Sequence, residues 1–293
     1  MKRLLIVDGH AYAYRAFYAI RNLRGPENRP TNAIYGFIKM LEKMRAALEP
    51  THMMVVWDGG LSAERVAAHP EYKTQRPEMP DDLETQLDEI VEYLAAVGTA
   101  SYCGRGIEAD DYIACLARRA AAAGWNVVIA SSDKDFMQLV APGIGLMNPN
   151  DKTGAVWSRE QVVAKAGVEP EQVGDWLALM GDAVDNIRGV PGVGPKTAAD
   201  LLKEFGSVAG LYARLAEVKS EKVRAALQGA AEAVKRNQRL VQLHEVACEF
   251  NPEQLAIRPA SREQLRELFR RWGFKGMIES LGRKPSGEQV ELI

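Results

Sequence analysis

With 293 residues, 47% of them apolar, the chain can bury a sizeable core, and it holds no apolar run near the roughly 20 residues that span a bilayer. Its three cysteines are widely spaced and form no C-x-x-C pair, which argues against a disulfide framework or a zinc site and favours a reducing cytoplasm. The formal net charge of −2 is unusual for a nucleic-acid binder, unless bound metal ions neutralise part of the acidic charge.

The first half of the chain alternates short apolar runs with helical patterns. The apolar runs predict buried strands at residues 4–7, 53–57 and 127–130. Helical periodicity between them predicts helices at residues 32–48, 83–97 and 109–123. This alternation is typical of an α/β fold with a mostly parallel central sheet flanked by helices.

In the second half the strand-like runs nearly vanish. Helical patterns cover residues 158–166, 172–180, 196–205, 220–243 and 262–272. We therefore expect an α/β core over residues 1–157 and a helical lobe over residues 158–282, followed by a frayed tail or linker start at residues 283–293. Residues 59–82 lack a clear period and are too long for an ordinary connection, so we expect them to be functional.

Acidic side chains follow all three predicted strands, at Asp8, Asp58 and Asp133. Because ligands bind outside the carboxyl ends of parallel strands, we expect these carboxylates to converge on one crevice. The structural alternative is that each aspartate caps the helix that follows its strand. Like charges held that close require a counter-ion.

Further acids enlarge this set. Three of them open the helix predicted at residue 109, which is more than the helix dipole requires. Of the other three, Asp135 lies two residues after Asp133, and Asp182 and Asp185 form a second close pair. The complete set of nine is Asp8, Asp58, Glu108, Asp110, Asp111, Asp133, Asp135, Asp182 and Asp185. Carboxylates are the ligands that Mg²⁺ prefers, and nine acids suit two Mg²⁺ ions, for which Mn²⁺ could substitute.

Two such ions can hold the attacking and leaving oxygens of a phosphodiester and make hydroxide available near neutral pH. This chemistry needs no histidine base, and the four histidines are scattered along the chain at His10, His52, His69 and His244. We interpret each as a surface or helix-start residue rather than a metal ligand. The acids therefore predict metal-dependent hydrolysis of a phosphodiester.

A glycine-rich segment at residues 189–194 precedes the helix predicted at residue 196, and Pro195 lies near the first turn of that helix. Its bare backbone can approach a phosphate closely, aided by the positive end of the helix. The alternative is a tight turn between helices without a ligand, and the Walker pattern is not matched. The candidate DNA contacts here are Arg188, Gly189, Val190, Gly192, Val193, Gly194, Lys196 and Thr197.

Cations and aromatic residues gather in two further segments. Residues 59–82 hold Arg65, Tyr72, Lys73 and Arg76, and Arg15 lies on the helix after Asp8. Cations pair with phosphates, and aromatic rings stack on unpaired bases. We expect Arg15, Lys73 and Arg76 to assist catalysis and Arg65 and Tyr72 to contact DNA, whereas Phe17 and Tyr18 fit the core better.

These motifs resemble, in order, those of the 5′ nuclease (flap endonuclease) family, and most closely the N-terminal 5′-3′ exonuclease domain of bacterial DNA polymerase I. The resemblance covers residues 3–282. It rests on Val7-Asp8-Gly9, Trp57-Asp58, Tyr72-Lys73-x-x-Arg76, Gly106-Ile107-Glu108-Ala109-Asp110-Asp111, Ser132-Asp133-Lys134-Asp135, Gly181-Asp182-x-x-Asp185-Asn186 and Gly189-Val190-Pro191-Gly192-Val193-Gly194. The chain departs from the family pattern at His10, Ser132 and Arg188, and no departure removes a carboxylate.

The resemblance implies two metal sets. The first contains Asp8, Asp58, Glu108 and Asp110 with Asp111 alongside, and the second contains Asp133, Asp135, Asp182 and Asp185. It also implies that Lys73 and Arg76 lie in a helical arch that threads a 5′ single strand. A helix-three-turn-helix element at residues 176–206 would grip duplex DNA and hold a K⁺ ion through backbone carbonyls.

The implied substrates are flap, nicked and gapped DNA, and the RNA strand of an RNA–DNA hybrid, cut without base-sequence specificity during replication and repair. The implied protein is monomeric, cytoplasmic and associated with the bacterial nucleoid, and is either fused to a DNA polymerase or works with one. Two other functions stay open at this point. One is a DNA-junction binding module without turnover, and the other is a ribonuclease of the PIN-like type, which would not need the glycine-rich segment.

Overall fold

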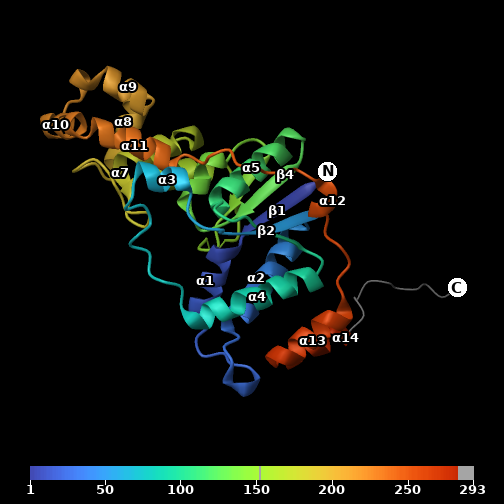
Figure 1. Cartoon of the computed structure of the whole chain (residues 1–293). Coiled ribbons are helices and arrows are strands. Elements are labelled where there is room, and N and C mark those ends of the chain that lie inside the picture. The colour runs from blue at the N-terminus through green and yellow to red at the C-terminus, as the bar shows by residue number, and fades with distance from the viewer. Residues whose placement is uncertain (152, 283–293) are drawn as a thin grey trace.

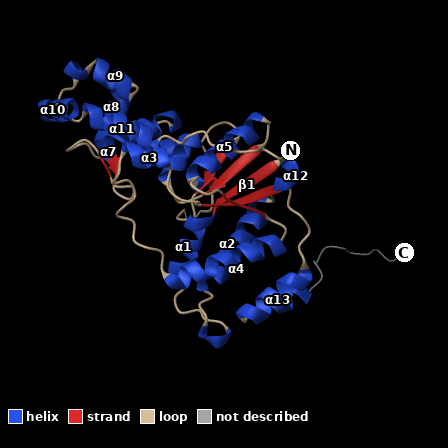
Figure 2. Cartoon of the chain, viewed as in Figure 1, coloured by secondary structure: helices blue, strands red, loops and turns tan. Residues whose placement is uncertain are grey.

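The computed structural model describes residues 1–151 and 153–282, so the expected tail lies outside the described residues. A six-stranded sheet forms the centre of the molecule, in the strand order β3-β2-β1-β4-β5-β6 (Figures 1 and 2). The first five of these strands are parallel, and β6 runs antiparallel to β5. The expected fold class, a mostly parallel sheet flanked by helices with a helical lobe, is confirmed.

The three predicted strands form the middle of the sheet: β1 (Arg3–Asp8), β2 (His52–Trp57) and β4 (Asn126–Ala130). The prediction missed β3 (Ala100–Cys103), β5 (Ile144–Met147) and β6 (Val156–Trp157). These strands have four residues or fewer, too short to show a periodic pattern.

Alternate side chains of β1 enter two separate cores, because successive residues of a strand point to opposite faces. Leu5 and Val7 pack with α1 (Gly9–Ala19), α2 (Asn32–Leu48), α4 (Asp81–Ala96), α13 (Arg262–Trp272) and α14 (Lys275–Gly282). Leu4 and Ile6 pack with α5 (Ala109–Ala122) and, through it, with the helical lobe. No helix in the described part of the chain is long and apolar enough to cross a membrane.

The lobe lies beyond α5, away from α13 and α14 (Figure 1). It contains α6 (Arg159–Ala166), α7 (Val173–Met180), α8 (Pro195–Phe205), α9 (Val208–Ala213), α10 (Glu221–Gly229) and α11 (Ala231–Val241). The single helix predicted over residues 220–243 is therefore wrong, since α10 ends at Gly229, and Ala230, with φ −102° and ψ 7°, separates it from α11. The short α12 (Pro252–Leu255) leads back to the sheet.

The segment between β2 and α4 forms the short helix α3 (Ala63–Ala68) followed by turns. These turns lie against the loop after β7 (Gly181–Asp182): the Lys73 amide donates to the Asp185 carbonyl at 3.1 Å, and the Asn186 side chain donates to the Glu71 carbonyl at 2.9 Å. The segment thereby connects the two halves of the molecule next to the carboxyl ends of the strands.

A close approach of two backbones fixes the loop that carries Asp182. Strand β7 pairs with β8 (Ile187–Arg188), and Gly181 (φ +79°) lies directly against Gly189. A Cβ on Gly189 would lie 2.2 Å from the carbonyl carbon of Met180, and one on Gly181 would lie 2.3 Å from the Gly189 nitrogen. No side chain fits at either position, so these two glycines are required by packing.

We predict that Gly189→Ala lowers the free energy of unfolding by about 2 kcal/mol or more, because the new methyl group would meet immobile backbone. Chemical denaturation of the purified protein measures this. The matched control is Gly174→Ala in α7, where the added Cβ meets nothing within 4 Å and should stabilise the helix by about 0.5–1 kcal/mol. Equal stability of Gly189→Ala and the parent would contradict the packing argument.

Candidate active site

A cavity of about 380 Å³ opens at the carboxyl ends of the central strands, and six carboxylates line it. They come from β1, from the residue after β2, from the start of α5, from the loop after β4, from β7 and from the loop after β7. In that order they are Asp8, Asp58, Asp110, Asp133, Asp182 and Asp185. The structure thus brings together acids that lie far apart in the sequence. The other lining side chains include His10, Tyr14, Arg76, Ser132 and Lys134.

Asp8 serves both roles that the sequence left open. It caps α1 by accepting from the Ala11 amide at 3.1 Å, and it also faces the cavity. Its second oxygen accepts from the Ser131 hydroxyl at 2.7 Å, and that hydroxyl accepts from the Asp133 amide at 3.0 Å. Burial, with the charges of Asp133 and Asp58, raises the pKa of Asp8 to about 6.

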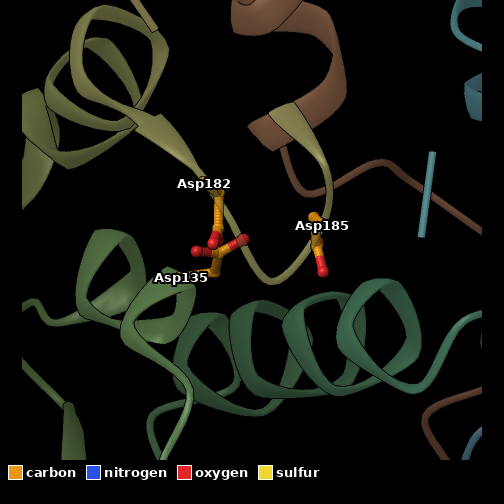
Figure 3. Close-up of side chains that lie close together, drawn as sticks. All are labelled: Asp135, Asp182 and Asp185. Carbon is orange, nitrogen blue, oxygen red and sulfur yellow. The ribbon is translucent and has the colours of Figure 1, made fainter. Parts of the chain in front are cut away.

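Three other acids form the closest carboxylate cluster in the described residues. Asp135, Asp182 and Asp185 each offer an oxygen within 4.8 Å of the others, and Asp135 and Asp182 lie side by side in Figure 3. The Oδ1 atom of Asp135 is buried without a hydrogen-bond partner. A buried oxygen of this kind needs a cation or a donor, so the donor set fits a hard divalent ion.

Burial, and then the charges of neighbouring carboxylates, also raise the pKa of Asp110, Asp133 and Asp135. Each of these groups resists ionisation because taking its charge out of water is costly and its neighbours repel it. A bound cation would favour the ionised form of these three carboxyl groups and so lower their pKa. The electrostatics of the cavity therefore agree with the metal-ligand chemistry of the side chains.

Cationic side chains neutralise part of the cluster. Lys134 donates to Asp182 at 2.6 Å, and Arg76 donates to Asp185 at 2.6 Å from a side chain that is 40% exposed. Lys73 is buried, with its Nζ 2.6 Å from Glu108. Burial alone would lower the pKa of Lys73, but the charges of Asp110, Asp185 and Glu108 raise it, so the ammonium stays charged.

Glu108 lies behind the cavity wall, fully enclosed by donors. Its carboxylate accepts from the Ser62 amide at 2.9 Å and from the Tyr72 hydroxyl at 3.1 Å, in addition to Lys73. Burial opposes ionisation, but the charges of Lys73 and Arg65 outweigh it and lower the pKa of Glu108. Glu108 is therefore ionised, and it connects α3, the turns after it and the start of α5.

The structure does not place Arg65 and Tyr72 on a DNA-facing surface, where we expected them. They are 3% and 2% exposed, respectively. Arg65 donates a hydrogen bond to each carboxylate oxygen of Asp111 at 2.7 Å and also donates to the carbonyls of Leu240 and Gln242. Sequence could not distinguish these buried anchors from surface contacts, because the partners come from distant segments.

Asp111 likewise differs from the expectation that it lies alongside the first metal set. Its two oxygens are taken by Arg65 and by the His244 amide at 2.8 Å. It does not line the cavity. The Arg65–Asp111 pair instead joins α3, α5 and the end of α11, so it ties the lobe to the base of the site.

The glycine-rich segment presents a mixed surface. Arg188, Gly192, Gly194 and Lys196 are exposed, and Thr197 is half-buried. Val190 and Val193 are buried, so their side chains belong to the core of the lobe, and only their backbone could reach a DNA strand. Gly192, at φ +78°, has open space where a side chain would point, which leaves the tip of the turn bare.

Arg15 does not line the cavity, in contrast to its expected catalytic role. It is exposed and donates to the side chain of Asn150. Tyr18, which we expected in the core, is 62% exposed and stacks on Tyr14 with ring centroids 6.4 Å apart. Two residues of the site were not predicted: Ser131, which binds Asp8, and Lys134, which stands between two of the predicted ligands.

Comparison with known proteins decides the family. The model "5'-3' exonuclease, N-terminal resolvase-like domain" matches residues 3–167, and the model "5'-3' exonuclease, C-terminal SAM fold" matches residues 168–263. The chain belongs to the 5′-3′ exonuclease family. It is thus a metal-dependent nuclease, and the match to the C-terminal fold disfavours the PIN-like ribonuclease alternative.

Relatives of this exonuclease occur alone and within longer proteins. A 5'-3' exonuclease of Aquifex aeolicus (strain VF5) is 37% identical over 285 residues, covering 97% of this chain and 96% of the relative. DNA polymerase I of Bacillus caldotenax is 38% identical over 297 residues, covering 100% of this chain and 34% of the polymerase. The chain therefore spans about a third of that polymerase's length.

Solved structures of bacteriophage T5 proteins share the fold. A T5 5'-exonuclease described with bound divalent metal ions (zinc) superposes with a TM-score of 0.69 at 26% identity, covering 83% of this chain and 90% of that chain. A T5 flap endonuclease in complex with DNA and metal ions gives a TM-score of 0.68 at 23% identity, covering 97% and 100%. At that identity the second likeness supports the fold alone.

We predict that Arg65→Met lowers the free energy of unfolding by about 3–5 kcal/mol, because it leaves the buried Asp111 carboxylate without its partner. Arg65→Lys should recover only part of this loss, since an ammonium cannot grip both oxygens. The control is Arg159→Met, which removes an exposed pair with Glu169 and should cost less than about 1 kcal/mol. Denaturant unfolding of the three variants is the measurement, and equal losses for Arg65→Met and Arg159→Met would refute the assignment.

Proposed function

We propose that this exonuclease is a structure-specific 5′ nuclease that uses two Mg²⁺ ions to hydrolyse DNA phosphodiesters near 5′ flaps, nicks and gaps. The observation that carries the proposal is the cavity at the strand ends, where six carboxylates meet and a further buried carboxylate oxygen lacks a partner. Mn²⁺ would substitute for Mg²⁺, because it also accepts oxygen ligands.

The carboxylates divide into two groups by position. Asp8, Asp58 and Asp110 would hold one ion, and Asp133, Asp135, Asp182 and Asp185 would hold the other. Glu108, which we expected in the first set, instead binds Lys73 behind the cavity wall. Asp111 is left out because Arg65 occupies both of its oxygens. When bound, the two cations would supply positive charge to the attacking and leaving oxygens of the phosphodiester.

Side chains of the chain itself then handle the phosphate. Arg76 lies on the cavity rim with an exposed guanidinium, so it can move from Asp185 to a phosphate oxygen as DNA enters. Lys73 lies deeper, between Glu108, Asp110 and Asp185, and keeps positive charge beneath the reacting group. The side chains of Arg76 and Lys73 would both stabilise the negative charge that develops on the phosphate during hydrolysis.

The lobe would hold the duplex next to the cut. Arg188, Lys196 and the bare turn at Gly192 form an exposed edge suited to the phosphate backbone, and carbonyls of this turn could bind a K⁺ ion. Phosphate contacts carry no base information, so substrate choice would rest on DNA shape and a free 5′ end. An RNA strand paired with DNA presents the same phosphates and is a further substrate.

Its relatives suggest the cellular setting. Several are named DNA polymerase I and come from bacteria, so we place this activity in bacterial replication and repair, in the cytoplasm at the nucleoid. It would act as a monomer, either joined to a DNA polymerase or alongside one. The Aquifex relative, which this chain matches almost end to end, supports the separate arrangement equally.

We predict that the protein cuts a 5′-labelled flap duplex near the junction in Mg²⁺ and that EDTA and Ca²⁺ abolish cutting. Asp133→Ala should reduce the single-turnover rate by at least about a hundredfold, because it removes a proposed ligand. Asp200→Ala, an exposed acid on α8 outside the cavity, is the matched control and should cut at the parent rate. Flap binding without any cut in Mg²⁺ or Mn²⁺ would instead support a junction-binding module.

Arg188 provides a test of the proposed DNA-binding edge. It is exposed directly before the glycine-rich turn, so we predict that Arg188→Ala weakens flap binding and lowers the slope of log affinity against log salt by about 1. Fluorescence anisotropy in Ca²⁺ over a salt series measures the slope. An unchanged slope would remove Arg188 from the interface.

A further inference from the structure

The orientation of one cavity side chain, His10, is determined by a backbone hydrogen bond. The Asp58 amide donates to the Nδ1 atom of His10 at 3.0 Å. A backbone amide is always a donor, so Nδ1 must carry a lone pair. In a neutral imidazole the proton then lies on the other ring nitrogen, Nε2.

The ring of His10 is also held in place by packing. It meets Trp57 edge to face, with ring centroids 5.4 Å apart. Trp57 is itself fixed, since its indole N–H donates to Ser101 at 2.9 Å and its ring stacks on Phe37. A Cβ on Gly9 would lie 2.6 Å from the Trp57 ring, which shows how tightly the start of α1 lies against it.

The Nε2–H group of His10 has no hydrogen-bond partner among the described residues, whereas the cations that line the same cavity are already paired. Arg76 and Lys134 line the cavity but donate to Asp185 and Asp182. His10 also lines it, and its one hydrogen bond among the described residues uses Nδ1. A cation beside Asp8 and Asp58 would be captured by those carboxylates, whereas a neutral N–H remains available for a ligand with oxygen acceptors.

We propose that His10 is a phosphate-contacting residue, whose Nε2–H donates to a non-bridging oxygen of the phosphodiester that is cut. The same tautomer prevents His10 from binding a metal ion, because Nε2 has no lone pair to offer. The inference rests on the proposed function, and it adds a neutral donor to the cations that handle the phosphate. Because this contact involves only the reacting phosphate, its loss should slow cleavage more than it weakens binding.

Two substitutions distinguish the role of Nδ1 from the role of Nε2 in His10. His10→Asn keeps an oxygen acceptor near the position of Nδ1 but has no group at the position of Nε2. His10→Gln extends an amide N–H toward the position of Nε2. His52→Asn is the matched control, because His52 lies at the start of β2 and does not line the cavity.

Single-turnover cleavage of a flap duplex in Mg²⁺ should be about tenfold to a hundredfold slower for His10→Asn, as expected for a lost hydrogen bond to a charged group. Flap affinity in Ca²⁺ should stay within about twofold of the parent, and His10→Gln should regain most of the rate. Parent-like cleavage by His10→Asn would overturn the inference, as would equal defects in His10→Asn and His10→Gln. Failure of the parent itself to cut would overturn the proposed function.

A second measurement does not depend on activity. Nitrogen-15 NMR of the imidazole groups distinguishes the two neutral tautomers of histidine. We expect His10 to carry its proton on Nε2 in the free protein and its Nε2 resonance to shift when a flap duplex is added in Ca²⁺. A proton on Nδ1, or an Nε2 resonance that does not respond to DNA, would contradict the contact.

Discussion

Repulsion between carboxylates is the constraint on which the rest of this structure depends. At an effective dielectric constant of about 20, two unit charges roughly 4 Å apart repel by about 4 kcal/mol, and six acids line a single cavity here. The fold can hold them only if counter-charges are close. Lys73, Arg76 and Lys134 provide part of that charge, and the raised pKa values of Asp110 and Asp135 show that part of the demand is unmet. Divalent ions would meet the remainder.

The need of these carboxylates for positive counter-charge also explains how the two halves of the chain are joined. Lys73 and Arg76 come from the segment between β2 and α4, and they pair with acids from α5 and from the β7–β8 loop. Arg65, earlier in the same segment, binds Asp111 and the carbonyls of Leu240 and Gln242 at the end of α11. Charge pairing at the base of the cavity therefore also positions the lobe that we propose to hold DNA.

Much of this architecture follows from sequence. The three central strands and the helix over residues 32–48 lie where periodicity predicts them, because long amphipathic or fully buried segments give strong patterns. The meeting of strand-end aspartates follows from the rule that parallel strands share one carboxyl edge. The short strands β3, β5 and β6 and the break at Ala230 give no such pattern, and all were missed.

The roles of individual cations were harder to infer. Arg65 and Arg76 stand in the same segment and look alike in sequence, yet one is buried against Asp111 and the other is exposed at the cavity. Their partners lie 46 and 109 residues away, so only the fold separates a buried anchor from a cation exposed at the cavity. The tautomer of His10 depends in the same way on an amide 48 residues away.

Two bound ions can be located directly by anomalous scattering from a crystal grown with Mn²⁺. We expect two Mn²⁺ ions per chain in the cavity, one contacted by Asp8 and the other by the Asp135, Asp182 and Asp185 cluster, and loss of the second ion in Asp135→Asn. A single ion, or none, at saturating Mn²⁺ would contradict the two-ion proposal.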